Sequence, residues 1–272
     1  MSARGSARPG RWLGIAATAA AALALVSPIA VTAAGAFSRS EWYGQRSEGA
    51  AVAGTAGLFR YVLVIWGGAL LHSAELVAVV VPLALLLGAP AAYAFRRRPF
   101  PGARALEAAA LAPLAIPGIA LAVALLETAA GSPRFLLLAA GHLAYSVPLV
   151  VKTVGNAAAG LGAGPASLEA AARTLGASPA EVARRIVVPL LRPALVLSAI
   201  LVFAVSWGEF NASFLLATPL LQTFPAALYA TYTTNSFPVA AAATIVFLLP
   251  VVPALVAIQA LGGEAFHRGL SA

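Results

Sequence analysis

The chain has 272 residues, of which 61% are hydrophobic and 10% are charged, and its formal net charge is +8. A soluble globular domain has about 45–50% apolar and about 25% charged residues, so this composition excludes an ordinary soluble protein. The absence of cysteine excludes a disulfide scaffold, and the absence of aspartate excludes metal or phosphoryl chemistry built on that residue. The basic residues lie between long apolar runs, which is typical of membrane loops and not of a nucleic-acid-binding face.

The first apolar run covers residues 12–37 and follows three arginines. It is longer than the apolar core of a signal peptide, about 7–15 residues, and long enough to cross a bilayer. We therefore expect a retained transmembrane helix, with cleavage in the alanine-rich sequence after Val31 as the alternative. A polar stretch at residues 38–55 follows. Residues 1–70 are thus expected to hold a cytoplasmic tail, the first transmembrane helix and an outer segment.

The second span is expected at residues 72–95. The apolar stretch before it, residues 58–71, is too short to cross alone and is expected at the outer interface. Further spans are expected at residues 106–127, 135–154, 193–216 and 240–261, with a long loop at 155–192. Residues 219–237 are expected to form an outer loop, which either meets a solute-binding protein or has no such role.

The distribution of Lys and Arg predicts the orientation in the membrane. With both termini in the cytoplasm, the inner segments hold Arg4, Arg8, Arg11, Arg96, Arg97, Arg98, Arg104, Lys152, Arg173, Arg184, Arg185, Arg192 and Arg268, which make 13. The outer segments hold Arg39, Arg46, Arg60 and Arg134, which make 4. This positive-inside bias favours six spans. The sequence therefore predicts an all-α polytopic membrane protein, with a five-helix core at residues 71–265 and a cytoplasmic tail at 266–272.

The long inner loop is expected to contain two short helices. Ser167 is expected to cap the first helix, with Glu169 in its first turn, where the helix dipole favours negative charge. Gly176 is well placed to end this helix in a left-handed turn.

The second short helix has its own start signal. Ser178 and Glu181 have the spacing of a capping box, and Pro179 suits the first helical position. Pro189 and Pro193 are expected to break the chain before the fifth span. On these residues alone, the hairpin is either an amphipathic loop on the membrane or a docking element for a partner.

The spacing of residues in this loop follows a longer pattern. Gly176, Ile186 and Pro189 fit a motif of Glu-Ala-Ala, three residues, Gly, nine residues, Ile, one residue and Leu-Pro. The triplet falls on Ala170, Ala171 and Ala172, the Leu position is Val188, and an acidic residue stands one position early, at Glu169. The loop resembles the Glu-Ala-Ala loop of type I ABC importer permeases, which are inner-membrane components of binding-protein-dependent transport systems.

The resemblance extends over most of the chain after residue 70. The second span ends in Gly88, Pro90, Ala91, Ala92 and Tyr93, which look like the family's Gly-x-Pro-Ala-Ala-Tyr segment. Residues 111–121 and 142–152 are similar to the family's third and fourth spans. Within the family, the chain looks most like the smaller permeases of polyamine, opine and phosphonate importers.

The resemblance implies a function as a permease that is not itself an enzyme. It implies that a separate ABC ATPase carries ATP and Mg and docks on the loop, at Glu169, the alanine triplet, Gly176, Ala177, Ile186 and Pro189. It also implies a second permease, related or identical, and an extracytoplasmic solute-binding protein. The sequence has no Gly-x-x-x-x-Gly-Lys phosphate loop, so no cofactor is expected on this chain itself.

One ionisable residue, Glu209, lies inside the fifth span. A charge at this depth is costly unless it faces a cavity or a partner, which makes it a candidate for function. With Trp207 and Asn211, which are expected to share a helix face, it could contact a cationic solute on the substrate pathway. The alternative is that Glu209 pairs with another helix or with the second permease.

The remaining polar residues do not predict a catalytic or metal site. His72, His142 and His267 lack the spacing of metal ligands, and His72 and His142 are expected as satisfied side chains near the membrane interfaces. Two other functions stay open as alternatives to an ABC permease. An ion-coupled secondary transporter would need an internal repeat, and an intramembrane enzyme would need polar groups that converge at one depth.

Overall fold

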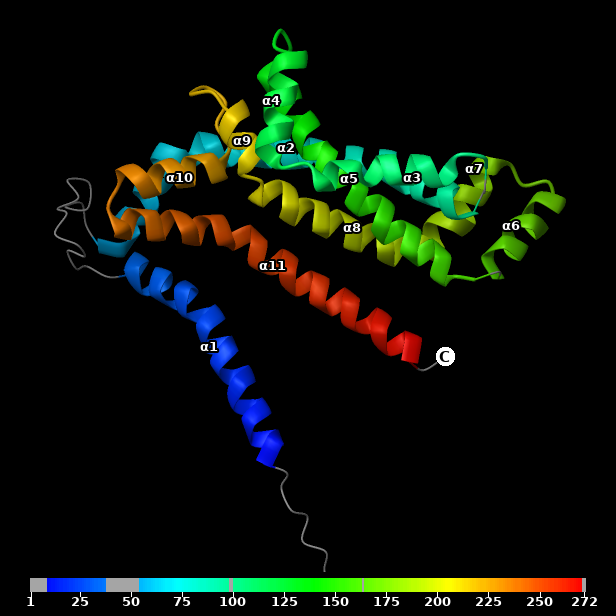
Figure 1. The fold of residues 1–272 in the computed structure, drawn as a ribbon, viewed down its shortest axis with the longest axis horizontal. Coiled ribbons are helices and arrows are strands. Elements are labelled where there is room, and N and C mark those ends of the chain that lie inside the picture. Colours follow the sequence, from blue (N-terminus) through cyan, green and yellow to red (C-terminus); the bar gives the residue numbers. More distant parts are fainter. Residues whose placement is uncertain (1–8, 38–53, 98–99, 163, 271–272) are drawn as a thin grey trace, which may run out of the picture. The chain divides into compact units, whose positions relative to one another are not determined.

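The computed structural model describes residues 9–37, 54–97, 100–162 and 164–270 of the chain (Figure 1). These residues are helical except for turns and one isolated β-bridge between Thr218 and Leu221. The first elements are α1 (Pro9–Phe37), α2 (Gly54–Arg97), α3 (Ala103–Leu111), the 3-10 turn η2 (Ala112–Ala115), α4 (Gly118–Thr128) and α5 (Arg134–Gly160). They are followed by α6 (Gly164–Thr174), α7 (Pro179–Val182), the π-helical turn η3 (Ala183–Val187), α8 (Val188–Gly208), α9 (Asn211–Leu216), α10 (Phe224–Thr234) and α11 (Phe237–Leu270).

The first of two compact units comprises residues 1–65 and 230–247. Its described part contains α1, the start of α2, the end of α10 and the start of α11. Ala36, Val62 and Ala242 are fully buried in it, and the rings of Phe37 and Phe59 lie 5.8 Å apart. The polar stretch that we expected at residues 38–55 lies outside the described residues, apart from its last two.

The second unit comprises residues 66–229 and 248–272, and α5 is the centre of its core. His142, Ser146, Val150, Val154 and Ala158 are all buried on this helix. Their spacing of four residues places them in one stripe along the helix, which is the pattern of a helix face that packs inward. Helix α8 lies alongside α5 (Figure 1).

Helix α2 is one continuous helix of 44 residues, so the stretch expected at residues 58–71 and the span expected at 72–95 belong to the same helix. Near the middle of the helix, Ser73 is buried and its hydroxyl accepts a hydrogen bond from the backbone N–H of Phe224 at 2.8 Å. At about 1.5 Å per residue, α2 is longer than the hydrocarbon core is thick. The expected boundary at residue 70 falls inside it.

The expected span at residues 106–127 is broken. Helices α3 and α4 meet at an angle of 104°, with η2 between them. Pro117 causes the break, because a residue before proline avoids the helical region, and Ile116 is extended with φ −91° and ψ 125°. The hydroxyl of Tyr145 on α5 donates a hydrogen bond to the Ile116 carbonyl at 2.7 Å. This bond satisfies a carbonyl that the break releases.

The fifth span differs from the expectation at both ends. A helical segment at Pro179–Gly208 runs through α7, η3 and α8, so Pro189 and Pro193 do not break the chain. A π-helical turn widens the helix just before Pro189, which accommodates a residue without an N–H group. The helix then ends at Gly208, because Glu209 is extended with φ −68° and ψ 117°. Residues 211–216 form the separate helix α9.

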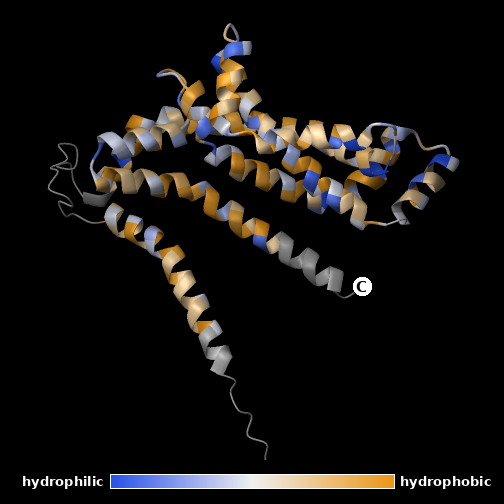
Figure 2. Cartoon of the chain, viewed as in Figure 1, coloured by the Kyte–Doolittle hydropathy of each residue, from blue (hydrophilic) through white to orange (hydrophobic). Residues whose placement is uncertain are grey.

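The remaining elements complete an all-α membrane protein, as expected. Helix α10 lies in the segment that we expected to be a loop at 219–237, and α5 and α11 extend the fourth and sixth spans. Among the described residues, five helices are long and apolar enough to cross a membrane, and the bent pair α3 and α4 makes six if it counts as one span. Hydrophobic residues run along the helices, and hydrophilic ones mark the tips of α4 and α6 (Figure 2).

The Lys and Arg count makes a testable prediction of the side of the membrane on which each loop and terminus lies. Reporter fusions at Ser271 and at Gly131, which lies between α4 and α5, should report cytoplasm and exterior respectively. Topology reporters that are active on only one side of the membrane would measure this. The same answer at both positions would contradict the six-span topology.

Candidate functional site

The hairpin, defined as α6, α7 and the turn between them (residues 164–182), has the two helix ends that the sequence predicted. Gly176 is left-handed, with φ +89°. Its N–H bonds the Arg173 carbonyl at 3.0 Å, and the N–H of Ala177 bonds the Ala172 carbonyl at 2.9 Å. This pair of bonds is a Schellman motif, which satisfies the last carbonyls of α6 and turns the chain.

The capping box at the start of α7 is also confirmed. The Ser178 hydroxyl accepts from the Glu181 N–H at 3.3 Å, and the Glu181 carboxylate accepts from the Ser178 N–H at 3.0 Å. The expected cap of the first helix is wrong, because α6 begins at Gly164 and the Ser167 hydroxyl donates to the Gly164 carbonyl at 2.6 Å. Pro165 favours the earlier start, since proline suits the first turn of a helix.

The residues that were expected to meet an ATPase differ in exposure. Ala170, Ala171, Gly176 and Pro189 are exposed, and Ala172, Ala177 and Ile186 are half-buried. Glu169 is only 6% exposed, so its carboxylate faces the protein. Sequence reasoning missed Leu175, which is 87% exposed at the tip of the hairpin. An apolar residue directly before the turn glycine is the signal that could have found it.

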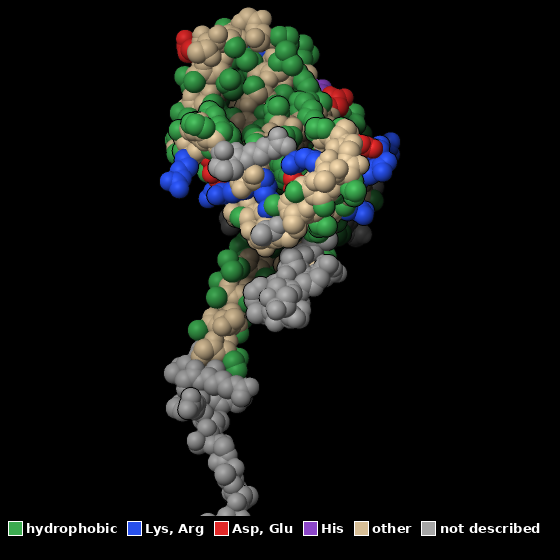
Figure 3. Space-filling view, turned by 90° about the vertical axis from the view of Figure 1, so that its right-hand side faces the viewer, with side chains coloured by type: hydrophobic (Ala, Val, Ile, Leu, Met, Phe, Trp, Pro, Cys, Tyr) green, Lys and Arg blue, Asp and Glu red, His purple; other side chains and the backbone are tan. Residues whose placement is uncertain are grey.

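Lys and Arg side chains gather at the end of the molecule where α6 lies (Figure 3). The hairpin itself carries Arg173, whose guanidinium is 3.2 Å from the Glu169 carboxylate. Arg185, just after α7, lies 4.0 Å from the carboxylate of Glu181 and is largely exposed. The basic character of this end agrees with a cytoplasmic position.

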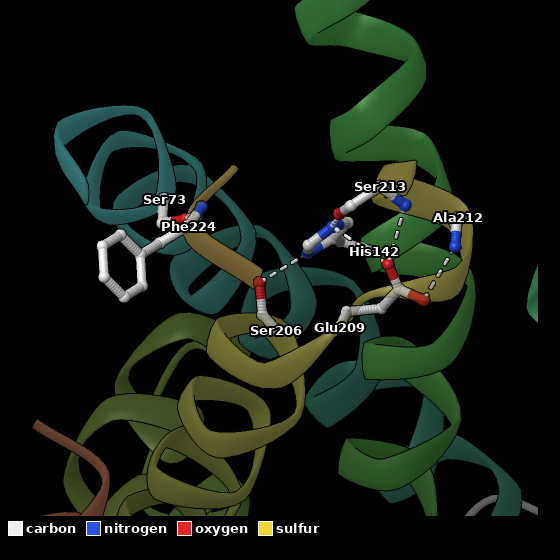
Figure 4. Close-up of polar contacts among 7 residues, drawn as sticks. All are labelled: Ser73, His142, Ser206, Glu209, Ala212, Ser213 and Phe224. Carbon is white, nitrogen blue, oxygen red and sulfur yellow. Dashed lines mark hydrogen bonds and ion pairs between the residues drawn. The ribbon is translucent and has the colours of Figure 1, made fainter. Parts of the chain in front are cut away.

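A second site lies where α8 gives way to α9. The carboxylate of Glu209 accepts hydrogen bonds from the backbone N–H groups of Ala212 at 2.9 Å and Ser213 at 3.0 Å (Figure 4). These are first-turn N–H groups of α9, which have no partner within the helix. Glu209 therefore stabilises the start of α9, and its side chain is 9% exposed.

His142 joins α5 to both sides of this break. Its Nδ1 lies 2.8 Å from the Ser206 hydroxyl on α8, and its Nε2 lies 3.0 Å from the Ser213 hydroxyl on α9 (Figure 4). The carboxylate of Glu209 is 3.7 Å from Nε2. His142 is 2% exposed and both of its ring nitrogens have partners, so it is the satisfied side chain that the sequence led us to expect. A histidine inside an apolar run, with serines in the span that packs against it, is the signal that the sequence carried.

Trp207 and Asn211 do not share a helix face, because the helix ends between them. Trp207 is buried and stacks on Phe203, with ring centroids 5.9 Å apart. Asn211 is exposed at the start of α9. A Cβ on Gly118, at the start of α4, would lie 2.7 Å from the Asn211 Cβ, so only glycine fits there. The break before α4 and the break before α9 therefore meet.

This meeting of two breaks is unusual for apolar segments. Non-helical backbone at membrane depth is tolerated only where it is buried in protein or lines a water-filled cavity. Gly208 and Asn211 are exposed at the break, whereas Glu209 is largely covered. The described residues contain no group of three or more His, Asp or Glu side chains that could hold a metal ion. The contacts at this site are hydrogen bonds and the approach of the Glu209 carboxylate to His142.

Comparison with known proteins assigns the family. Residues 81–262 match the family described as binding-protein-dependent transport system inner membrane component. The chain belongs to this family. It is a multi-pass inner-membrane protein of the permease type found in ABC importers, in which the membrane subunit is not the ATPase.

Individual relatives support the same family. The chain is 35% identical over 179 residues to the trehalose transport system permease SugB of Mycobacterium tuberculosis, covering 63% of this chain and 62% of that protein. It is 35% identical over 206 residues to the molybdenum transport system permease ModB of Mycobacterium tuberculosis, covering 69% of this chain and 76% of that protein. A putative 2-aminoethylphosphonate transport system permease, PhnV of Salmonella paratyphi A, is 31% identical over 61% of this chain and 63% of its own length.

A solved structure shows the same fold. A bacterial ABC transporter involved in the import of the acidic polysaccharide alginate matches with a TM-score of 0.62 and 19% identity, covering 94% of this chain and 98% of that chain. The relatives named above concern a sugar, molybdenum and an aminophosphonate. They do not select the polyamine, opine and phosphonate branch, which stays a prediction.

Proposed function

We propose that this chain forms one half of the solute pathway of an ATP-driven importer and that the hairpin couples it to a separate ATPase. The exposed tip of the hairpin supports this role. The left-handed turn at Gly176 presents small residues and the apolar Leu175 side chain outward. A partner surface can approach such a backbone closely, and an exposed apolar side chain is a natural anchor in a pocket. The coupling set comprises Glu169, Ala170, Ala171, Ala172, Gly176, Ala177, Ile186 and Pro189.

The proposed assembly distributes the chemistry among several subunits. ABC ATPase subunits bind ATP and Mg, a second permease completes the pathway, and an extracytoplasmic binding protein delivers the solute. Movement of the ATPase changes transport only if its contact with the hairpin differs in free energy between the inward-facing and outward-facing states.

The solute pathway is proposed to pass the break between α8 and α9, at Trp207, Glu209 and Asn211. The exposed backbone at Gly208 supports this, because irregular backbone in a membrane lines a cavity or is covered by protein. Transporters also place solutes at discontinuous helices, where main-chain groups are free to bind. The close approach of Gly118 and Asn211 brings a second break to the same place.

An amino-bearing solute suits this site best. The Glu209 carboxylate uses one acceptor position on each oxygen for the N–H groups of α9, and each oxygen can accept more than one hydrogen bond. The relative named for 2-aminoethylphosphonate transport is consistent with an amine, whereas the trehalose and molybdenum relatives are not.

Glu209→Gln tests the proposed contact with an amine. The amide keeps only one oxygen for the two α9 N–H groups and loses the charge, and uptake of the solute is expected to fall about tenfold or more, the effect of losing a charge-assisted hydrogen bond. Uptake by whole cells and assembly of the purified complex are the measurements. The matched control is Glu127→Gln, at the exposed end of α4, which should transport normally. If the complex fails to assemble, the role of Glu209 is structural.

The overall function is tested by purification of the chain from its native membrane. We expect an ATPase to co-purify, and its hydrolysis to rise when the solute-loaded binding protein is added. An ion-coupled transporter would instead move solute in vesicles along an ion gradient with no nucleotide. Uptake that persists without the ATPase would refute the proposal and support that alternative.

A further inference from the structure

The cytoplasmic end of α2 is bonded to three other parts of the second unit. The Tyr93 hydroxyl donates a hydrogen bond to the Glu169 carboxylate on α6. Arg96 forms an ion pair with Glu107 on α3 at 2.6 Å. Arg97 donates to the carbonyl of Gly162, between α5 and α6, at 2.7 Å. The last turn of α2 is thus bonded to α6, to the segment between α5 and α6, and to α3 of the bent pair α3 and α4.

Glu169 stands apart from the rest of α6. Its neighbours Leu168 and Ala170 are exposed, whereas Glu169 is 6% exposed. Burying a carboxylate is unfavourable unless partners compensate for the lost water. Glu169 has two such partners, the Tyr93 hydroxyl and the Arg173 guanidinium at 3.2 Å. The burial is therefore maintained by specific bonds, and one of them leaves α6 for α2.

The route from α6 to α2 runs through side chains. The backbone of α6 packs against α7 and η3. Helix α2 contacts α6 through the hydrogen bond from the Tyr93 hydroxyl to the Glu169 carboxylate. Arg97, on the same turn of α2, donates a hydrogen bond to the Gly162 carbonyl in the connection that leads into α6. Movement of the hairpin is transmitted to α2 only if these side-chain contacts stay formed during the movement.

We infer that Tyr93 and Glu169 fasten the hairpin to the cytoplasmic end of α2, so that hairpin and helix move as one body. This inference rests on the proposed coupling of the hairpin to an ATPase. Tyr93 is a positioning residue, because it acts through Glu169 and touches neither solute nor nucleotide. The ion pair of Arg96 and Glu107 extends the same body to α3, and so to the bent span that reaches the break at Asn211.

Tyr93→Phe removes the hydroxyl and keeps the ring. We expect the ATPase to co-purify and to keep its basal hydrolysis, while stimulation by the solute-loaded binding protein falls about fivefold or more, within the usual range of coupling between sites. Glu169→Ala removes the acceptor of the Tyr93 hydroxyl and should also lower this stimulation, and the double variant should be no worse than Glu169→Ala alone, because the two residues share this interaction. The matched control Tyr232→Phe changes an exposed tyrosine on α10 and should behave as wild type.

A cross-link supplies a second, independent measurement. Ala94 on α2 and Pro179 on α7 both line a groove of about 380 Å³. The chain has no cysteine, so Ala94→Cys with Pro179→Cys creates the only pair that a bifunctional thiol reagent can join. If hairpin and α2 move as one body, the cross-linked protein still transports. In the Tyr93→Phe background the cross-link should restore stimulated hydrolysis.

Two results would overturn the inference. One is normal stimulation and uptake in Tyr93→Phe. The other is loss of uptake on cross-linking the cysteine pair in the wild-type background, because it would show that the hairpin must move against α2. The second result decides the question even if Tyr93→Phe fails to assemble. Failure of the proposed function looks different, since then no ATPase would accompany the wild-type chain.

Discussion

Gly176→Val is expected to abolish uptake while the protein still inserts in the membrane. The residue has φ +89°, and a side chain in that region costs about 1 kcal/mol or more, with β-branched residues fitting worst. Open space surrounds the Cβ position, so the strain lies in the backbone and not in a clash within the chain. The turn would lose its Schellman bonds, and the valine would stand between the hairpin and an ATPase surface.

Two measurements separate the mechanisms of this loss. Absence of the ATPase after purification would indicate that docking failed, whereas a bound ATPase without solute-stimulated hydrolysis would indicate that coupling failed. The matched control is Gly160→Val at the end of α5, which also has open space around its Cβ position but no left-handed backbone. Normal uptake by Gly176→Val at normal expression would show that the hairpin is not the coupling element.

His142→Ala is expected to destabilise the second unit and to abolish uptake. The substitution removes the bonds from α5 to Ser206 and Ser213 on the two sides of the helix break. It leaves the two buried hydroxyls without their His142 partner, whereas the Glu209 carboxylate keeps its two hydrogen bonds from α9. We expect a loss of about 2 kcal/mol in the free energy of unfolding, since each unsatisfied buried group costs about 1 kcal/mol or more, though membrane hydrogen bonds tend to be weaker.

Thermal unfolding of the purified protein in detergent would measure this loss. Ser146→Ala is the matched control, because Ser146 is fully buried one turn further along α5 and its hydroxyl has no hydrogen-bond partner among the described residues. That variant should unfold at nearly the wild-type temperature. Equal destabilisation by both substitutions would mean that the polar bridge at His142 contributes nothing beyond side-chain packing.

The membrane class, the helical content and the ends of the hairpin could be predicted from the sequence alone. Long apolar runs have one stable structure in a bilayer, because every backbone group must bond within its own helix. The turn at Gly176 and the capping box at Ser178 could be predicted as well, since both depend on bonds between residues at most five positions apart. The spaced motif around Gly176 also gave the correct family.

Helix boundaries were predicted less well at prolines, because a proline ends a helix in one place and lies inside a helix in another. Pro117 breaks a span, but Pro193 lies inside α8. Proline removes one N–H in both cases, and the neighbouring structure decides whether the helix continues. At Pro117 the released Ile116 carbonyl is satisfied by Tyr145 on α5, and before Pro189 a π-helical turn relieves the crowding.

The partners of the buried charges were decided only by the tertiary structure. The sequence shows that Glu209 lies in an apolar run and must be compensated, but its partners depend on the position where α8 ends. Glu169 belongs to the proposed coupling set, and the sequence could not show that it accepts a hydrogen bond from Tyr93, 76 positions earlier in the chain. The sequence alone shows that a buried carboxylate needs partners, because burying an unpaired charge is costly. Which side chains become those partners depends on how distant helices pack, and only the tertiary structure decides that.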